Sequence, residues 1–88
     1  MITEYQTNEE SKLEEMVKYI VSRVVDHPEM VMVQIDNEND IIHVTLEVDK
    51  NDLGKVIGRS GTTAWALRTL IQAVAMKLGK RASFKIVE

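Results

Sequence analysis

The glycines of this chain are concentrated in one short segment. Three of the four fall within GKVIGRSG, residues 54–61. Glycine adopts backbone angles that other residues avoid, so this density predicts a tight loop that a ligand can approach closely. The loop is not a Walker A motif, because only three residues separate Gly54 from Gly58 and Arg59 follows where that motif has lysine. It also joins two predicted helices, whereas the dinucleotide fingerprint joins a strand to a helix.

An amphipathic helix is predicted near the start of the chain. Thr7 and Glu10 match a capping box, and apolar residues then recur with helical spacing. This stripe consists of Leu13, Met16, Val17, Ile20, Val21 and Val24. Pro28 is expected to end the helix, because the residue before a proline is pushed out of helical angles. Residues 1–6 are expected to form a flexible tail.

Two strands and a turn are predicted after this helix. Residues 30–35, MVMVQI, are rich in β-branched side chains and predict a strand. The polar residues 36–40 predict a turn. Residues 41–48 alternate between apolar and polar side chains, as in a strand that is buried on one face. We therefore expect an antiparallel hairpin.

Two helices are predicted around the glycine loop. Asp49 is placed to cap a short helix over residues 50–57, and Asp52 to favour its first turn. A long helix over residues 62–78 follows the loop. Its core face is expected to hold Ala64, Leu67, Ile71, Val74, Ala75 and Leu78.

The chain is predicted to close with a strand over residues 82–87, after Gly79 at a helix C-cap position. The resulting order, α-β-β-α-α-β, predicts an α+β fold with a three-stranded sheet and helices packed on one face. A chain of 88 residues suffices for one small domain, here residues 7–88, and leaves little room for a deep catalytic pocket.

The two halves of the chain differ in charge. Residues 1–49 hold 12 acidic and 3 basic residues, a net charge of −9. Residues 50–88 hold 2 acidic and 8 basic residues, a net charge of +6. This asymmetry fits a basic face for an anionic partner. It equally fits a fold that mixes the two halves and averages their field, and the sequence leaves both open.

The glycine loop suits a phosphate group. Gly58 and Gly61 leave no Cβ in the way of a ligand. The helix that starts after the loop turns free N–H groups and the positive end of its dipole toward it. Arg59 and Lys55 add formal positive charge. An ordinary turn between two helices would show the same four-residue pattern, so the pattern alone leaves both interpretations open.

The segment Val56-Ile57-Gly58-Arg59-Ser60-Gly61 resembles the V-I-G-x-x-G signature of K-homology (KH) domains, and the order of elements resembles their type II form. More narrowly, DLGKVIGRSG, the downstream ALRTL and the short length resemble the small bacterial KH proteins of the KhpA family. The resemblance implies single-stranded RNA held in a groove, with the loop clamping about four nucleotides of backbone. The implied contact residues are Lys55, Ile57, Gly58, Arg59, Ser60, Gly61, Ala64 and Arg68.

The same resemblance implies a partner of the KhpB (Jag/EloR) type, an RNA-chaperone role and a link to cell elongation and peptidoglycan homeostasis. The first residues show no signal-peptide pattern, so we expect a cytoplasmic protein without membrane insertion. Two residues depart from the family pattern. Thr62 stands where a basic residue is common, and Trp65 where a small or basic one is usual. Fewer phosphate contacts imply weaker binding.

The long helix has a second apolar stripe that its core face does not use. Small residues in this stripe would let two helices approach closely, so we expect a dimer, either with a second copy or with another KH protein. The expected interface comprises Trp65, Ala66, Thr69, Leu70 and Ala73. Two alternatives stay open: Leu70 borders the core, or Trp65 stacks on a base or lies in solvent.

No catalytic or metal site is predicted. The chain has no cysteine, which excludes thiol catalysis and zinc thiolate sites. His27 and His43 lack ligand spacing, and a partial calcium-loop pattern over residues 36–47 has Ile41 where that loop needs glycine. We expect no enzyme and no cofactor. The rival functions are a protein-interaction module with little RNA affinity and a regulator that binds a phosphate ligand or nucleotide.

Overall fold

The structure, a computed structural model, describes residues 8–88. Its helices and strands are α1 (Asn8–Ser22), β1 (Met32–Glu38), β2 (Ile41–Glu47), α2 (Leu53–Ile57), α3 (Thr62–Lys77) and β3 (Arg81–Ile86). Short 3₁₀ turns lie at Pro28–Met30, Lys50–Asp52 and Arg59–Gly61. The order is the predicted α-β-β-α-α-β. Within the described part of the chain, no helix is both long and apolar enough to cross a bilayer. The expected tail and the capping Thr7 lie outside the described residues.

The three strands form one mixed sheet in the order β1-β2-β3. β1 and β2 pair antiparallel, with Val33 opposite Leu46, and form the predicted hairpin. β2 and β3 run parallel, with Val44 opposite Phe84. A parallel pair needs a long crossover, which α2 and α3 supply.

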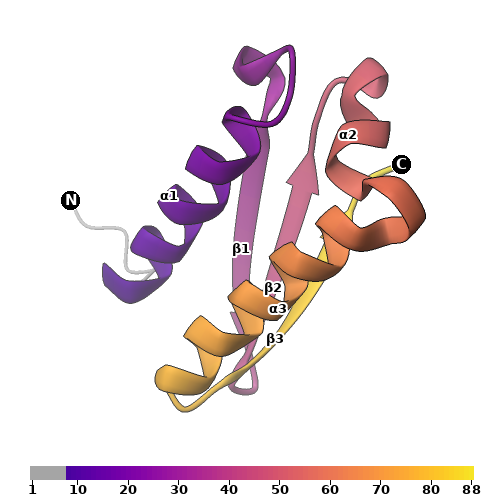
Figure 1. Cartoon of the computed structure of the whole chain (residues 1–88). Helices are drawn as coiled ribbons and strands as arrows, with labels where there is room; N and C mark the ends of the chain where they lie inside the picture. The colour runs from indigo at the N-terminus through magenta and orange to yellow at the C-terminus, as the bar shows by residue number, and fades with distance from the viewer. Residues whose placement is uncertain (1–7) are drawn as a thin grey trace, which may run out of the picture.

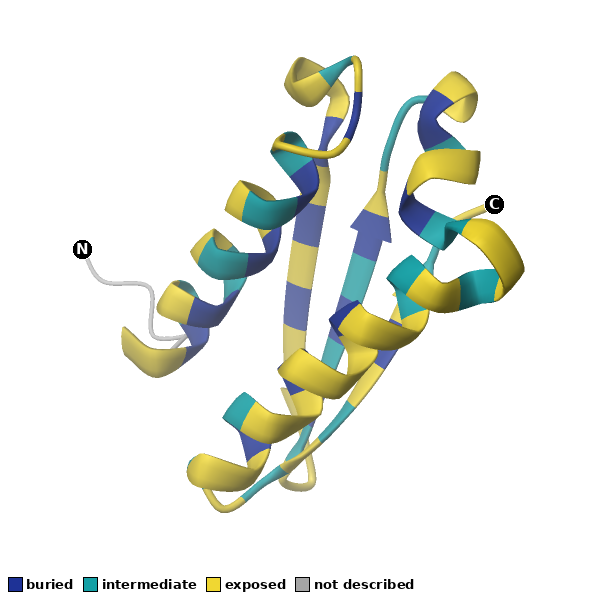
Figure 2. Cartoon of the chain, in the orientation of Figure 1, coloured by how far each residue is buried: buried dark blue, intermediate teal, exposed yellow. Residues whose placement is uncertain are grey.

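Both long helices cover the same face of the sheet (Figure 1). α1 packs on β1, α3 packs on β3, and the two helices contact each other. Every second strand residue points toward them, which gives the alternating buried bands of Figure 2. The centre of the core is formed by Leu13, Val17, Val21, Val33, Ile35, Ile42, Val44, Leu46, Val56, Leu67, Ile71, Ala75 and Phe84. The predicted core face of α3 is thereby confirmed, with Ala64, Val74 and Leu78 half-buried at its margins.

The first helix ends earlier than predicted. α1 stops at Ser22, where the backbone tightens and the Val24 amide donates to the Val21 carbonyl at 2.9 Å. Val25, whose amide donates to the Val21 carbonyl at 3.1 Å, continues the buried face four residues after Val21, and Val24 is left 39% exposed. The predictions that Val24 extends the apolar stripe and that Pro28 ends the helix are therefore wrong. Pro28 instead begins a 3₁₀ turn, where its fixed φ is suitable.

The hairpin turn is shorter than the polar segment predicts. β1 continues to Glu38, so the expected strand end at residue 35 and the expected turn over residues 36–40 are wrong. Only Asn39 and Asp40 form the turn, with φ of 53° and 63°. Two left-handed residues are typical of a type I′ turn, which asparagine and aspartate tolerate. The polar residues from Asp36 onward led to a predicted strand end that is too early, because polar residues also occupy the solvent face of β1.

Folding keeps the two charged halves apart. The acidic residues of α1 lie over β1. The stretch from Leu53 to Val87, which includes α2, α3 and β3, contains seven basic residues and no acidic one. The two halves meet in the ion pairs Lys55–Asp26 and Lys80–Glu10, but α3 and β3 themselves carry only basic charges, so the side of the molecule along them is basic.

Candidate nucleic-acid interface

The loop between α2 and α3 has the backbone geometry that its glycines predict. Gly58 has φ 79° and ψ 169°, and Gly61 has φ 75°. Ser60 also lies in the left-handed region, with φ 55°, where a side chain costs roughly 1–2 kcal/mol. Such residues persist only where the surroundings fix them, so this loop has one defined shape.

Gly58 is required by packing as well as by its angles. A Cβ at this position would lie 2.8 Å from both the Cβ and the backbone N of Thr63, which is closer than such atoms approach. The Gly58 amide donates to the Gly54 carbonyl at 2.9 Å, and the Gly61 amide donates to the Gly58 carbonyl at 3.1 Å. The loop therefore packs directly against the first turn of α3.

The N-terminus of α3 is open to an anion. Gly61 is the N-cap and has no side chain that could accept hydrogen bonds from the first turn. The Gly61 and Thr62 amides donate to the Gly58 and Arg59 carbonyls, so a ligand here is offered the positive end of the helix dipole and the remaining amides of the first turn. Thr62 Oγ1 donates to the Arg59 carbonyl at 2.8 Å. The side chains of Arg59 and Ser60 are exposed beside this helix end. The four central residues of the predicted site thus surround one helix N-terminus.

Three further predicted contact residues extend from the loop toward β3. Ile57 and Ala64, which flank the loop in the chain, are half-buried and provide apolar surface next to it. Arg68 is exposed on α3, and its guanidinium carbon lies 6.0 Å from the centre of the Phe84 ring in β3. Arg68 therefore lies where α3 meets β3.

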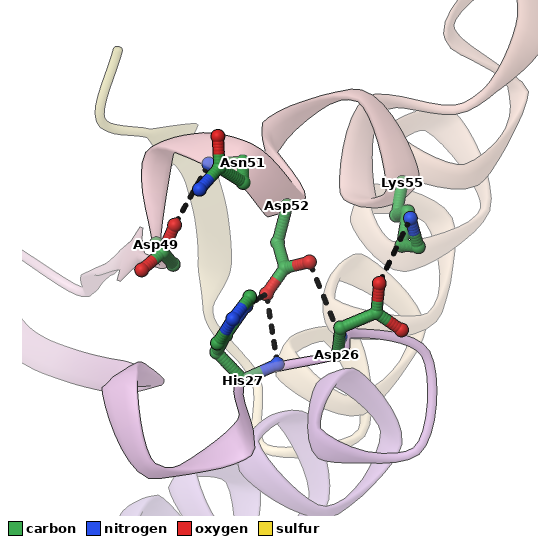
Figure 3. A network of polar contacts seen from close by, with 6 residues as sticks. All are labelled: Asp26, His27, Asp49, Asn51, Asp52 and Lys55. Atoms are coloured by element: carbon green, nitrogen blue, oxygen red, sulfur yellow. Dashed lines mark hydrogen bonds and ion pairs between the residues drawn. The ribbon is translucent and has the colours of Figure 1, made fainter.

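Lys55 is the predicted contact residue that already has an acidic partner. Its Nζ lies 3.3 Å from Oδ2 of Asp26, in the connection between α1 and β1 (Figure 3). The two side chains are 45% and 67% exposed, so water screens the pair and its contribution to stability is small. A phosphate that contacts Lys55 would therefore compete with Asp26 for its ammonium group.

A buried carboxylate fixes the position of α2, which leads into the loop. Asp52 is fully buried and accepts hydrogen bonds from the backbone amides of Asp26, at 3.2 Å, and His27, at 3.0 Å. Its Oδ2 also lies 3.1 Å from Nδ1 of the His27 ring (Figure 3). Because a buried carboxylate without partners is very unfavourable, these contacts hold the connection after α1 against the start of α2.

The sequence predicts the cap at Asp49 but not the burial of Asp52. Asp49 accepts a hydrogen bond from the Asn51 amide at 2.8 Å and caps the turn before α2, as expected. The sequence also places Asp52 in the first turn but does not reveal its burial, because its partners lie 25 and 26 residues earlier. One available signal is the spacing of Asp52 from Val56. Residues four apart share one side of a helix, and both are buried.

The contact between Asp52 and His27 shifts both pKa values. The hydrogen bond to Asp52 raises the pKa of His27 above its ordinary value of 6.5, against the effect of burial, and Asp49 and Glu29 reinforce the increase. Burial opposes the ionisation of Asp52, but hydrogen bonds from Asp26 and His27 outweigh it and lower the pKa of Asp52. Both shifts favour the charged pair.

Three polar residues approach one another across the open face of the sheet. His43 Nδ1 lies 2.7 Å from Ser83 Oγ, and His43 Nε2 lies 3.8 Å from Glu38 Oε1. The order of groups resembles a nucleophilic triad, but Ser83 is exposed and the Glu38 side chain is 74% exposed, so bulk water surrounds all three. They form a surface network. Among residues 8–88, no three His, Cys, Asp or Glu side chains gather closely enough to hold a metal ion.

The chain matches one protein family over most of its length. The family is described as "KhpA/KhpB, KH domain", and it matches residues 14–86. The "RNA-binding protein KhpA" of Listeria monocytogenes is 40% identical over 76 residues, which cover 86% of this chain and 100% of that protein. The protein of the same name from Bacillus subtilis is 38% identical over 76 residues, which cover 86% of this chain and 94% of that protein.

A solved structure shares the fold. The crystal structure of Aquifex aeolicus Era bound to GDP and aluminium fluoride aligns over 99% of this chain with a TM-score of 0.56 and 16% identity. This chain spans only 34% of the Era chain, so the likeness concerns the fold alone.

The element order, the mixed sheet and the glycine loop between α2 and α3 define a type II KH domain. The matched family and the relatives narrow this class further: the chain belongs to the KhpA/KhpB KH-domain family. Those relatives are named as RNA-binding proteins and not as enzymes, in agreement with the prediction that this chain is not an enzyme.

Alanine should be tolerated less well at Gly58 than at Gly61. A Cβ at Gly58 would clash with Thr63. A Cβ at Gly61 would have no atom within 4 Å, so the only cost there is the backbone strain of a non-glycine residue at positive φ. We expect Gly61→Ala to lower the free energy of unfolding by about 1–2 kcal/mol, and Gly58→Ala to lower it by more. Urea denaturation followed by circular dichroism measures both, and equal losses would show that contact with Thr63 is not what requires glycine.

Stability should fall as the pH rises through the raised pKa of His27. A group whose pKa is raised by folding stabilises the folded state fully below its ordinary pKa of 6.5 and loses this contribution above the raised value. Asp52 has a lowered pKa, so its contribution is present above its ordinary value of 3.8 and disappears in stronger acid. Urea denaturation should therefore give a lower free energy of unfolding at about pH 8 than at about pH 5.5.

The two histidines provide a matched control for this pH dependence. His27→Gln should remove most of it, whereas His43→Gln, which changes the only other histidine, should preserve it. Equal wild-type stability at both pH values, or an unchanged pH dependence in His27→Gln, would contradict the role of the Asp52–His27 pair.

Proposed function

We propose that this chain binds single-stranded RNA through the loop from Gly58 to Gly61. The observation that carries the proposal is the open N-terminus of α3, with Arg59 and Ser60 exposed on a loop of defined shape and on the basic side of the molecule. A phosphate at such an N-terminus gains hydrogen bonds from backbone amides and a favourable dipole. The names of the relatives support RNA as the source of that phosphate.

Each residue of the proposed site has a distinct role. The loop clamps about four nucleotides of backbone, as KH loops do. Ile57 and Ala64 provide the apolar floor on which bases lie, and Arg68 borders it near β3. Lys55 gives up its ion pair with Asp26 to contact a phosphate. The loss of stability is small, because an ion pair this exposed contributes little.

We also propose that the chain works as a dimer through α3, with a second copy or with a KhpB (Jag/EloR-type) protein. The dimer stripe consists of Ala66, Thr69, Leu70 and Ala73, all of which are exposed. Trp65, which the sequence also predicts for this interface, is exposed one helical turn before Thr69. Leu70 is 49% exposed, so about half of its side chain is accessible to a partner. One domain that holds about four nucleotides has little selectivity, and joining two domains lengthens the footprint and raises the effective concentration of the second contact.

An apolar groove beside the dimer stripe supports this interface. The groove, of ≈ 460 Å³, lies between α1 and α3 and is lined by Glu9, Lys12, Leu13, Met16, Ala73, Val74, Lys77 and Leu78. Ala73 belongs to both the groove and the stripe, so the two form one surface. Exposed apolar surface of this kind, with charged residues at its rim, is typical of sites where proteins associate.

The cellular role that we propose is that of a cytoplasmic RNA chaperone, linked through a KhpB-type partner to cell elongation and peptidoglycan homeostasis. Family membership supports this role. The dimer stripe also suits a protein-interaction module with little RNA affinity, and the glycine loop suits a regulator that binds a small phosphate ligand. Competition of bound RNA by a mononucleotide, titrated against salt, distinguishes these alternatives.

Replacing Arg59 and Ser60 with aspartates should abolish RNA binding without unfolding the protein. Both side chains are exposed and both glycines remain, while negative charges replace the contacts to phosphate. Aspartate also tolerates the left-handed angles of Ser60. For the wild type, log K against log salt should have a slope of about −2 to −3, from about 0.7 per phosphate over three or four phosphates. Fluorescence anisotropy with an unstructured RNA oligonucleotide measures both.

The matched control is Asn8→Asp with Lys18→Asp, which makes the same change in net charge on the exposed surface of α1. Its affinity should fall far less. A folded loop variant that binds RNA as well as the wild type would refute the loop assignment, and an affinity independent of salt would point to a small ligand or to stacking alone.

Leu70→Asp should dissociate the dimer and leave the monomer folded. A charge in a helix–helix contact is unfavourable, but Leu70 is 49% exposed in the monomer. Leu67→Asp and Ile71→Asp should cost far more stability, because these side chains are 4% and 0% exposed. Light scattering and circular dichroism report the two effects. The dimer proposal fails if the wild type is monomeric at high concentration, alone and with a KhpB-type partner, or if Leu70→Asp unfolds.

A further inference from the structure

The exposed surface of α3 has two sides with different neighbours. At about 100° per residue, Trp65 lies roughly 140° around the helix from Leu70 and only about 20° from Gln72 and Met76. Trp65 therefore shares a side of α3 with Gln72 and Met76, whereas Leu70 lies on the other side. That other side faces α1, because Ala73 lines the apolar groove between the two helices.

Two contacts show that the side with Trp65 faces β3. Arg68, about 60° from Trp65 on the helix, lies over the Phe84 ring of β3. Further along, Gln72 and Met76 line a cleft of ≈ 260 Å³. The remaining walls of this cleft are Lys80, Arg81 and Ala82, where the chain enters β3. We call this surface, from Trp65 through Arg68, Gln72 and Met76 to Lys80 and Arg81, the α3–β3 seam.

The seam begins at the glycine loop and ends among cations. Trp65 stands four residues, about one helical turn, after Gly61. At the far end, Arg81 is exposed. The positive charge of Lys80 is partly neutralised, because its Nζ lies 3.5 Å from Glu10 Oε2. The elements that form the seam contain no acidic residue. A chain of phosphates that leaves the loop along the seam therefore meets no acidic residue of α3 or β3, and at its far end it meets Lys80 and Arg81, which share a pocket with Asp40 of the hairpin turn.

Trp65 is the one tryptophan of the chain and is 64% exposed. One exposed apolar side chain needs no explanation by itself, but this one lies between a phosphate-binding loop and a row of polar and basic side chains. An aromatic ring beside a basic groove is the arrangement on which bases of single-stranded nucleic acid stack, whatever their sequence. Trp65 borders both the seam and the dimer stripe, because Thr69 of that stripe lies one turn further along and only about 40° around the helix, whereas Leu70 lies about 140° away.

We propose that Trp65 is a base-stacking platform on a longer RNA track, which leaves the glycine loop, follows the α3–β3 seam and ends in the cleft at Lys80 and Arg81. This inference rests on the proposed RNA binding. From Gly61 to Met76 the track measures about 22 Å at 1.5 Å per residue. This length extends beyond the loop, so an RNA longer than the four nucleotides that the loop clamps is needed to follow the track.

The test compares uridine oligonucleotides of four and eight nucleotides. The wild type should bind the longer one more tightly, and the longer one should quench the fluorescence of Trp65 more strongly. Trp65→Ala should weaken binding of the eight-nucleotide RNA about ten-fold, as removal of stacking aromatic residues does, and should change binding of the four-nucleotide RNA little. Trp65→Phe should restore part of the loss. Arg81→Gln should weaken binding of the longer RNA alone and reduce its salt slope by about 0.7.

Tyr19→Ala is the matched control, because Tyr19 is an aromatic residue of similar exposure, 62%, on α1 and away from the seam. It should leave both affinities unchanged. Circular dichroism and light scattering on every variant show whether folding and oligomeric state persist.

The track proposal is overturned if Trp65→Ala leaves the affinity for the longer RNA unchanged, or if Trp65→Ala dissociates the dimer, since Trp65 would then be an interface residue. In either case the loop proposal stands as long as the aspartates at positions 59 and 60 still abolish binding of the four-nucleotide RNA. Failure of the wild type to bind either RNA overturns both proposals.

Discussion

The burial of one carboxylate fixes the position of the helix that leads into the glycine loop. Asp52 stays in the interior because two backbone amides and the His27 ring compensate its charge, and all three come from the connection after α1. α2 has only five residues, of which Val56 alone is buried, so apolar packing gives it little anchorage. The α1–β1 unit therefore fixes α2, and α2 fixes the loop. The same contact makes this anchorage depend on the protonation of His27.

The separation of charge in the fold gives the loop its basic surroundings and limits their strength. α1 and the hairpin keep most acidic residues, while α3 and β3 keep basic ones. The acidic half reaches the basic half in two ion pairs, Lys55 with Asp26 near the loop and Lys80 with Glu10 at the far end of α3. Each pair removes part of the positive charge that an RNA backbone would meet. For the proposed RNA binding, we therefore expect a modest affinity that responds to salt.

α3 separates two proposed functions on its two sides. The side that faces β3 continues the glycine loop as a track with Trp65, Arg68 and the cations of the α3–β3 seam. The side that faces α1 joins the dimer stripe to an apolar groove. Leu70 lies about 140° around the helix from Trp65, so a second KH domain centred on Leu70 would leave the seam accessible to RNA, with Trp65 and Thr69 at the border between the two surfaces. Two joined domains would then present two tracks to one RNA, which raises the effective concentration of the second contact.

The sequence by itself determined the order of elements, the hairpin, the core face of α3 and the loop at Gly58–Gly61. These features depend on local periodicity and on backbone angles that glycine alone adopts readily. Both can be read from residues that are close together in the sequence. The end of α1, the burial of Asp52, the pairing of Lys55 with Asp26 and the side of α3 on which Trp65 lies were decided by the tertiary structure. Each depends on which distant segment becomes a neighbour. Asp52 meets its partners across 25 and 26 residues, and Trp65 belongs to a surface that exists only once β3 lies against α3, so no local pattern encodes either.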